Sequence, residues 1–236
     1  MKAVILAGGL GTRMGDATAA LPKPLVQVGG RPILWHILKG YQAHGISDFI
    51  VCAGHAGHRL CEFFEQERGA EPWTVQVVDT GLHTATGGRL RRVRHLLGDE
   101  TFCMTYGDAV ADVDVTALLA LHRAQHRLVT VTAVQPRLHF GVIAFGADGH
   151  PVGFQEKPRL DDMWVNGGFF VIEPAALDAV TSDEQAWEDA PMTGLARAGQ
   201  LAAYRHGGFW QCMDAPRDRD TLERIWQAGD ARWKVW

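Results

Sequence analysis

Residues 1–13 read MKAVILAGGLGTR, a short apolar segment that runs directly into three closely spaced glycines. Residues 2–6 have the length and composition of a buried β-strand. Gly8, Gly9 and Gly11 allow backbone N–H groups to approach anionic oxygens, because no Cβ is in the way. A strand followed by such a loop predicts a phosphate site at the edge of an α/β sheet. A tight strand-to-helix corner explains the pattern about equally well on its own.

The rest of the N-terminal half alternates between strand-like and helix-like segments. The clearest helix is predicted from Pro32, with an apolar stripe that ends before Gly45. This alternation predicts an α/β fold, doubly wound around a mainly parallel sheet. The further apolar segments of strand length are 49–53, 74–79, 101–105 and 128–134.

After about residue 138 the pattern changes to antiparallel signals. The segments HFGVIAF (139–145) and VGFQEK (152–157) flank a turn, and VNGGFFVI (165–172) follows them. We expect these strands to extend the sheet and to form a small antiparallel part that covers the substrate. LAAYRH and GFWQCMD are also strand-like, and residues 217–228 are predicted to be a final helix. With 236 residues, the chain is expected to form a single domain, 1–236.

Composition excludes several classes of protein. The chain has 23 Lys and Arg against 27 Asp and Glu, for a net charge of −4, so no basic field for nucleic-acid binding is expected. Its four cysteines are scattered without a CxxC pair, which argues against a zinc site or a disulfide framework, and they are interpreted as core or near-core thiols. The N-terminal apolar segment is too short for a signal sequence or a membrane span, so a cytoplasmic protein without membrane contact is predicted.

Two cations follow the glycine loop. Arg13 is the last residue of the loop. Lys23 stands between Pro22 and Pro24, which stiffen the segment and hold the lysine side chain in one direction. Two cations beside one anion site favour a polyphosphate ligand. The loop lacks the GxxxxGK[ST] spacing of a P-loop, and Met14 stands where GxGxxG needs its third glycine. A dinucleotide-dependent oxidoreductase is therefore discounted.

A carboxylate follows the strand TFCMTY, at Asp108. The carboxyl edge of a central parallel strand is where open α/β sheets bind ligands, so Asp108 is a candidate Mg²⁺ ligand. Mg²⁺ commonly takes one or two protein carboxylates, and Asp214 at the end of GFWQCMD is the predicted second one. Its spacing fits equally well an N-cap of the helix that follows Pro216.

Taken together, the motifs resemble those of the sugar-1-phosphate nucleotidyltransferases. The resemblance covers nearly the whole chain, and within the family it is nearest to the branch that transfers a cytidylyl group from CTP to glucose 1-phosphate. It is carried by LAGGLGTR, PKP, GRPILWHIL, TGGRL, TYGD, FQEKP, NGGFF, WE, GFWQCMD and WKVW.

The resemblance implies a Rossmann-like fold and a role for each motif. The sugar phosphate attacks the α-phosphorus of the nucleotide, and pyrophosphate leaves. It implies Mg²⁺ on Asp108 and Asp214, catalytic cations at Arg13, Lys23 and Lys157, and small-molecule substrates, with a homo-oligomer as a possible assembly. The implied sugar-phosphate ligands are Glu156, Lys157 and Asn166, and the implied nucleotide ligands are Leu6, Ala7, Gly8, Gly9, Gly11, Thr12, Arg13, Thr84, Arg89 and Gly107.

The chain also departs from the family pattern. Only EQERGA lies between Phe64 and Glu71, where related cytidylyltransferases have a longer segment. Ala109, Val142 and Ala215-Pro216 replace the usual residues near the expected metal and sugar. The sugar is therefore left open between glucose and a modified sugar. Uridylyl or thymidylyl transfer remains the alternative reaction, and a non-catalytic nucleotide-sugar-binding homologue is a weaker one.

Overall fold

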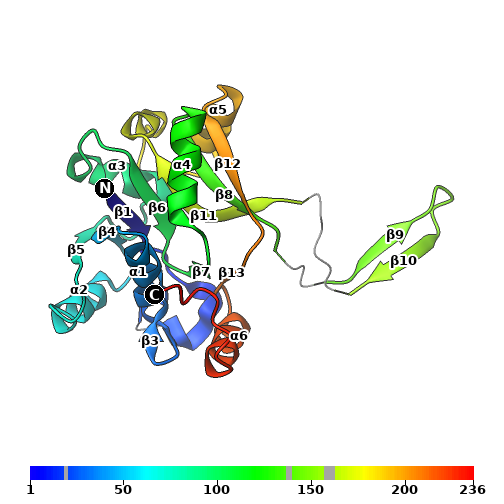
Figure 1. Ribbon diagram of the computed structural model, residues 1–236, viewed down its shortest axis with the longest axis horizontal. Coiled ribbons are helices and arrows are strands. Elements are labelled where there is room, and N and C mark those ends of the chain that lie inside the picture. The colour runs from blue at the N-terminus through cyan, green and yellow to red at the C-terminus, as the bar shows by residue number, and fades with distance from the viewer. Residues whose placement is uncertain (19–20, 137–139, 157–162) are drawn as a thin grey trace.

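A seven-stranded sheet forms the centre of the computed structural model, which describes residues 1–18, 21–136, 140–156 and 163–236. The strand order is β12-β8-β11-β6-β1-β4-β5 (Figure 1). Among the described strands of this sheet, β11 alone runs antiparallel to its neighbours, and it lies between β6 and β8. The strands are β1 (Lys2–Leu6), β4 (Asp48–Ala53), β5 (Thr74–Asp79), β6 (Phe102–Tyr106), β8 (Val129–Val134), β11 (Val165–Ile172) and β12 (Leu201–His206).

Helices cover both faces of the sheet, as expected for a doubly wound fold. One buried cluster joins α1, α2, α4 and α6 to one face, and a second joins α3 and α5 to the other. Neighbouring residues of β1 divide between the faces, with Ile5 in the first cluster and Val4 in the second. The helices are α1 (Ile33–Ala43), α2 (Gly57–Gln66), α3 (Thr86–Val93), α4 (Val115–Gln125), α5 (Ala190–Arg197) and α6 (Pro216–Gln227).

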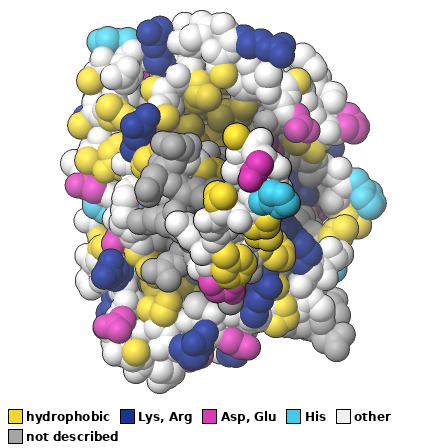
Figure 2. Space-filling model, turned by 90° about the vertical axis from the view of Figure 1, so that its right-hand side faces the viewer, with side chains coloured by type: hydrophobic (Ala, Val, Ile, Leu, Met, Phe, Trp, Pro, Cys, Tyr) yellow, Lys and Arg dark blue, Asp and Glu magenta, His cyan; other side chains and the backbone are white. Residues whose placement is uncertain are grey.

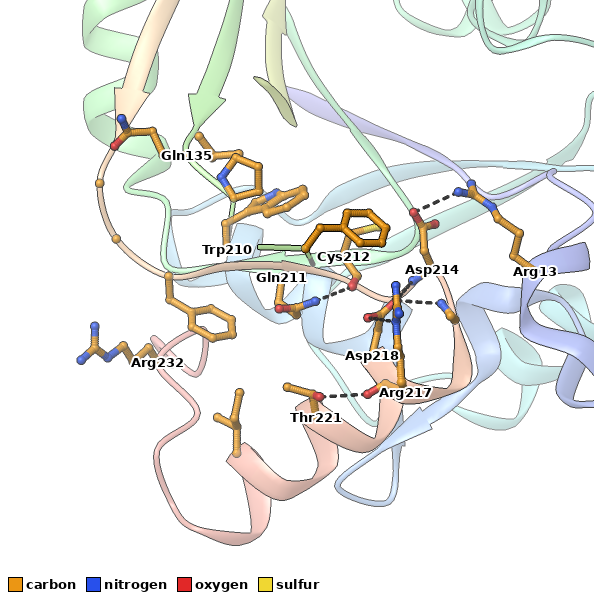
Figure 3. Close-up of a pocket in the computed structure, with 18 residues that line it drawn as sticks. Arg13, Gln135, Trp210, Gln211, Cys212, Asp214, Arg217, Asp218, Thr221 and Arg232 are labelled. Carbon is orange, nitrogen blue, oxygen red and sulfur yellow. Dashed lines mark hydrogen bonds and ion pairs between the residues drawn. The ribbon is translucent and has the colours of Figure 1, made fainter. Parts of the chain in front are cut away.

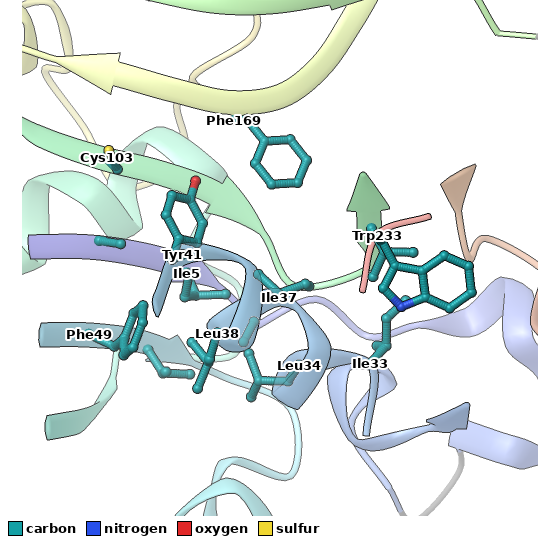
Figure 4. Close-up of a cluster of buried hydrophobic side chains, with 14 of the residues drawn as sticks. Ile5, Ile33, Leu34, Ile37, Leu38, Tyr41, Phe49, Cys103, Phe169 and Trp233 are labelled. Atoms are coloured by element: carbon teal, nitrogen blue, oxygen red, sulfur yellow. The ribbon is translucent and has the colours of Figure 1, made fainter. Parts of the chain in front are cut away.

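Helix α1 confirms the predicted apolar stripe. Its side chains at Ile33, Leu34, Ile37, Leu38 and Tyr41 are all buried against the sheet (Figure 4). The helix begins directly after Pro32, whose fixed φ suits the start of a helix, and the chain reverses at Gly45 with φ of 79°.

The C-terminal tail packs against α1 through a cluster of aromatic rings. His36 of α1 is 2% exposed and its ring contacts Trp35, Trp226, Trp233 and Trp236. Its Nε2 lies 2.8 Å from the carbonyl oxygen of Val28, and Trp233 Nε1 donates to its Nδ1 at 3.4 Å. The two tryptophans of the motif WKVW thus pack around α1, whereas Lys234 and Val235 between them are exposed.

One expectation about the C-terminal half is wrong. The strands β9 (Val142–Phe145) and β10 (Pro151–Gln155) do not extend the central sheet but pair only with each other. Their hairpin projects away from the body (Figure 1), and Figure 2 shows hydrophobic side chains on the face from which it extends. Its apolar side chains cannot reach the central core, and they are exposed at Ile143, Phe145, Val152 and Phe154.

Two further short pairs complete the described strands. β2 (Gln27–Val28) pairs with β3 (Arg31–Pro32), and β7 (Ala109–Ala111) pairs with β13 (Trp210–Cys212). No helix in the described ranges has both the length and the apolar character required to cross a bilayer.

Candidate active site

The antiparallel pair of β7 and β13 brings Asp108 and Asp214 together. Asp108 directly precedes β7 and Asp214 lies just beyond β13, so antiparallel pairing puts both at the same end of the ribbon. The main-chain N–H of Met213 donates to the carbonyl oxygen of Asp108 at 2.8 Å and fixes the register there. Two acids that lie far apart in the sequence therefore face one site.

Lys23 lies between these two carboxylates. Its Nζ is 2.7 Å from Asp108 Oδ2 and 2.8 Å from Asp214 Oδ1. Burial lowers the pKa of Lys23, but the charge of Asp108 and the hydrogen bonds to both acids outweigh this effect, so the net pKa is raised. The ammonium group thus stays charged and forms ion pairs with both acids at once.

Arg13 reaches the same group of charges from the glycine loop. Its Nη1 is 3.2 Å from Asp214 Oδ2. For Asp214, burial raises the pKa, but the hydrogen bond and charge of Lys23, with a contribution from Arg13, bring the net pKa below its usual value. Asp214 is ionised at neutral pH.

The alternative role of Asp214 as a helix cap is not what the structure shows. Asp218 Oδ2 accepts hydrogen bonds from the main-chain N–H groups of Asp214 and Ala215, at 3.0 and 2.8 Å. Asp218 therefore satisfies the N–H groups at the start of α6, while the Asp214 side chain turns to Lys23.

Cys212 is a site residue that the sequence analysis missed. Its sulfur and the carboxylates of Asp108 and Asp214 offer ligand atoms within 4.8 Å of one another. Burial and the two neighbouring acids raise the pKa of this thiol. Its position two residues before Asp214 on a strand was the available signal, because residues i and i+2 share a face. The two carboxylates fit the oxygen preference of Mg²⁺, whereas a thiol suits softer metals.

A cavity of about 440 Å³ lies in front of the glycine loop. All ten predicted nucleotide ligands line it, together with Lys23, Asp108 and Asp214. Five further residues of the lining were not among the predicted ligands: Leu10, Pro24, Ala85, Thr86 and Tyr106.

Arg89 supports the glycine loop from behind. The side chain is 4% exposed, and its guanidinium donates to the carbonyl oxygen of Gly8 at 3.0 Å and to that of Ala53 at 2.9 Å. A Cβ on Gly8 would overlap the guanidinium, whereas a Cβ on Gly9 would meet nothing within 4 Å. Gly8 is thus required by a close approach, and burial lowers the pKa of Arg89.

A bulge in β11 orients Asn166. The pairing of β11 with β8 shifts register between Asn166 and Phe170, where Gly168 has φ of 74° and Phe169 φ of 50°. Trp210 Nε1 donates to the carbonyl oxygen of Gly167 at 2.7 Å, and Thr132 donates to that of Phe169 at 2.8 Å. A positive φ is unfavourable for phenylalanine, so these contacts hold a backbone shape that the paired glycines permit.

The predicted sugar-phosphate residues are only partly assembled. Asn166 Nδ2 donates at 3.1 Å to the hydroxyl of Tyr106, a wall residue of the cavity in front of the glycine loop. Glu156 follows β10 at the base of the projecting hairpin and is exposed. Lys157 lies outside the described residues.

A larger cavity of about 1060 Å³ adjoins the first (Figure 3). The two cavities share Arg13 and Asp214, so the paired charges stand between them. Its wall also includes Phe140 next to the hairpin and Trp210 and Gln211 of β13.

Sequence comparisons match this chain to known proteins over its full length. Residues 2–207 match the family model described as Nucleotidyl transferase. The chain is 45% identical to "Glucose-1-phosphate cytidylyltransferase" of Salmonella typhimurium over 257 aligned positions, with 100% of each chain covered. It is 38% identical to "Probable glucose-1-phosphate cytidylyltransferase" of Bacillus subtilis, again with 100% of each covered.

The Salmonella alignment also bears on chain length. Its 257 positions exceed the 236 residues of this chain, so at least 21 aligned positions have no counterpart here. In the structure, residues 67–73 are the whole connection between α2 and β5. Within it, Glu71 accepts hydrogen bonds from Lys39 at 3.0 Å and from Trp35 Nε1 at 3.1 Å, which tie the connection to α1.

Solved structures share the fold at low sequence identity. HddC from Yersinia pseudotuberculosis superposes with a TM-score of 0.77 at 18% identity, covering 95% of this chain and 99% of that one. A UDP-glucose pyrophosphorylase complexed with UDP-glucose gives a TM-score of 0.74 at 16% identity, with 97% and 98% covered. These likenesses confirm the predicted mainly parallel, Rossmann-like fold.

Proposed function

Because the chain belongs to the nucleotidyl transferase family, we propose that it transfers the cytidylyl group of CTP to glucose 1-phosphate, giving CDP-glucose and pyrophosphate. The identity of 45% to the Salmonella enzyme over the whole of both chains supports this reaction. The observation in the structure that carries it is the cavity in front of the glycine loop, at whose mouth Lys23 joins Asp108 and Asp214.

The chemistry is an in-line displacement at the α-phosphorus of CTP. An oxygen of the sugar phosphate forms the new P–O bond, and the bond to the pyrophosphate leaving group breaks. The attacking oxygen is already ionised at neutral pH, so no general base is needed. The protein contributes by placing the reactants and by neutralising charge.

The cavity residues divide this work. The glycine loop at Gly8, Gly9 and Gly11 binds phosphate oxygens through backbone N–H groups. Arg13 and Lys23 meet the charge that develops on the α-phosphate and the leaving group, and Lys157 binds the sugar phosphate. Arg89 acts from beneath, because its bonds to Gly8 and Ala53 keep the loop in its shape.

We propose Mg²⁺ as the divalent metal of the reaction, held by Asp108 and Asp214. Their ligand atoms lie within 4.8 Å of each other, and the Lys23 ammonium between them shows that the position suits a cation. When bound, Mg²⁺ neutralises phosphate charge and orients the phosphates for displacement. Lys23 is then free to turn from the acids to the nucleotide.

The remaining proposals concern setting and assembly. The reaction uses charged small molecules, so we propose a cytoplasmic enzyme that acts as a single domain, residues 1–236, without nucleic-acid or membrane partners. Assembly into a homo-oligomer stays a prediction. The use of a modified sugar in place of glucose stays open.

The test is a grid of nucleotides against sugar 1-phosphates with purified protein, Mg²⁺ and a pyrophosphate assay. CTP with glucose 1-phosphate should release pyrophosphate and form CDP-glucose. Release with UTP or dTTP but not CTP would favour the uridylyl or thymidylyl alternative. Binding without release under any combination would instead point to the non-catalytic homologue.

A further inference from the structure

A chain of hydrogen bonds links the nucleotide cavity to Asn166 through Glu188. Thr86 Oγ1 donates to Glu188 Oε2 at 2.5 Å, and the Tyr106 hydroxyl donates to Glu188 Oε1 at 2.5 Å. Asn166 Nδ2 donates to the same Tyr106 oxygen at 3.1 Å. Thr86 and Tyr106 line the nucleotide cavity, whereas Asn166 is the predicted sugar ligand. Glu188, itself an exposed residue, thus contacts Thr86 and Tyr106 directly and Asn166 only through Tyr106.

The backbone around Glu188 is held against the start of α3. Gly88 N–H donates to the carbonyl oxygen of Gln185 at 3.2 Å, and the main-chain N–H of Trp187 donates to Thr86 Oγ1 at 2.9 Å. A Cβ at Gly87 would lie 2.6 Å from the Gln185 oxygen, so glycine permits this close approach. Trp187 itself is fully buried. The Glu188 carboxylate is therefore built on a fixed segment.

The charge state of Glu188 sets the direction of every bond in the chain. An ionised carboxylate only accepts, so Thr86 and Tyr106 must both donate to it. The Tyr106 oxygen is then left to accept from Asn166. A tyrosine hydroxyl ordinarily keeps its proton at neutral pH, so it can donate to the carboxylate.

The direction of these hydrogen bonds also fixes the orientation of the Asn166 side-chain amide. Its Oδ1 accepts from the Gly168 N–H at 2.9 Å, within the β11 bulge, while one N–H of Nδ2 is given to Tyr106. The second N–H of the amide remains for an oxygen of the substrate. If the Tyr106 hydroxyl reversed, its O–H would face the N–H of Asn166. Two donors would then oppose each other, and the Asn166 amide would lose this orientation.

We propose that Glu188 is a positioning residue that couples the two substrates, holding Thr86 at the nucleotide cavity and, through Tyr106, the Asn166 amide at the acceptor. The proposal rests on the proposed function, since it takes Asn166 to face the sugar phosphate. Occupation of one side by CTP fixes Thr86 and hence the shared carboxylate, so it favours the Asn166 orientation that receives glucose 1-phosphate. Binding of the two substrates should be mutually favourable.

Glu188→Gln tests the proposal with little change in shape. Glutamine offers one acceptor oxygen in place of two, and its NH₂ group faces a hydroxyl that must then reverse. We expect KM for glucose 1-phosphate to rise about 5- to 10-fold, as for one misplaced hydrogen bond of roughly 1 kcal/mol, with kcat changed less than KM. Glu184→Gln is the matched control, because Glu184 is an exposed acid of the same loop. It should behave as the unaltered protein.

Binding measurements provide a second test. A purely structural role of Glu188 would leave the coupling between the two substrates unchanged. Glucose 1-phosphate is titrated calorimetrically with and without the non-reactive analogue α,β-methylene-CTP and Mg²⁺. The unaltered protein should bind the sugar phosphate more tightly with the analogue present, and Glu188→Gln should lose most of that gain. Tyr106→Phe should lose it too, and combining the two changes should add little.

Two results would overturn the inference. One is unchanged KM and unchanged coupling in Glu188→Gln. The other is a fall in the midpoint of thermal unfolding and in kcat with KM unaltered, which would make Glu188 a stabilising residue only. Failure of the proposed function is distinguishable, because it would appear as absence of pyrophosphate release from the unaltered protein, before any variant is compared.

Discussion

The carboxylates of Asp108 and Asp214 meet at one ammonium group, at 2.7 and 2.8 Å. Each acid adjoins one strand of the β7–β13 ribbon, so the ribbon, and not proximity in sequence, creates the charged centre. Removal of either acid leaves Lys23 with one carboxylate partner.

The two carboxylates should be indispensable for turnover. Asp108→Asn and Asp214→Asn each remove one ligand charge, and we expect kcat to fall about 10²- to 10⁴-fold, as for the loss of several kcal/mol of charge stabilisation. The midpoint of thermal unfolding should barely change. Asp220→Asn, at an exposed acid of α6, is the control. Near-normal activity in Asp214→Asn would show that the two-carboxylate site is wrong.

The two lysines should affect different substrates. Lys23→Ala should mainly raise KM for CTP, because Lys23 lines the nucleotide cavity, and Lys157→Ala should mainly raise KM for glucose 1-phosphate. Initial rates measured with each substrate varied in turn separate the two effects. Lys234→Ala, in the C-terminal tail, serves as the control. Equal losses for both substrates in both variants would contradict this division.

Base selection should favour CTP over UTP. Groups that complement the 4-amino donor of cytosine are left unpaired by the carbonyl of uracil, at roughly 1 to 3 kcal/mol per group, which is about 5- to 150-fold in kcat/KM. With glucose 1-phosphate as acceptor, dTTP should be similar to or below UTP, and purine nucleotides poorest. Competition assays with paired nucleotides measure the ratio. A preference for UTP or dTTP with several sugar phosphates would reject the cytidylyl assignment.

Gly8 and Gly9 should respond differently to alanine. At Gly8 the new Cβ would overlap the Arg89 guanidinium, so the loop or the arginine must move, at a cost of about 1 to 3 kcal/mol. We expect a lower unfolding midpoint and a higher KM for CTP. Gly9→Ala meets nothing within 4 Å and should keep the stability of the unaltered protein. Equal stability of both variants would argue against the support that Arg89 gives to the loop.

His36 should make stability depend on pH. Burial lowers its pKa below 6.5, against opposing effects of the Val28 and Arg31 carbonyls, so the unfolded chain binds more protons than the folded one just below pH 6.5. Its contribution is complete above pH 6.5 and is lost as pH falls toward the folded pKa, by at most about 1.4 kcal/mol per pH unit.

Denaturant unfolding followed by tryptophan fluorescence at pH 7.5 and 5.5 measures this effect. The free-energy advantage of the unaltered protein over His36→Gln should shrink at the lower pH. An identical difference at both pH values would show that His36 does not contribute.

Local patterns predicted the central sheet and α1, because buried strands and an apolar helical stripe are local properties of the chain. They failed for the hairpin at residues 142–155. The alternation of side chains there indicates that strands form, but it does not indicate which sheet the strands join. The family motifs supplied ten predicted nucleotide ligands, and the structure places all ten around one cavity; their role stays a prediction.

Two residues stand in motifs that carry the resemblance, Glu188 in WE and Tyr106 in TYGD, but nothing in the sequence indicated the contacts between them. Glu188 joins Thr86 and Tyr106 only because the segment before it packs on α3, and spacing along the chain carries no trace of that contact. Tyr106 appeared in the sequence as the last residue of a strand. Its hydroxyl gains a role only from Asn166, which reaches it through the bulge in a strand distant in sequence.

The position of β11 also has a consequence for synthesis on the ribosome. Residues 2–106 already hold the parallel strands β5, β4, β1 and β6, which can pair as soon as they emerge. The free edge of β6 is covered only by β11, and β8, although made earlier, reaches the sheet only through β11. A nascent chain therefore carries an uncovered strand edge until residue 172 leaves the exit tunnel, and an exposed edge of this kind is open to pairing with other chains. Translation speed across residues 107–172 thus sets how long the newborn protein is vulnerable to aggregation.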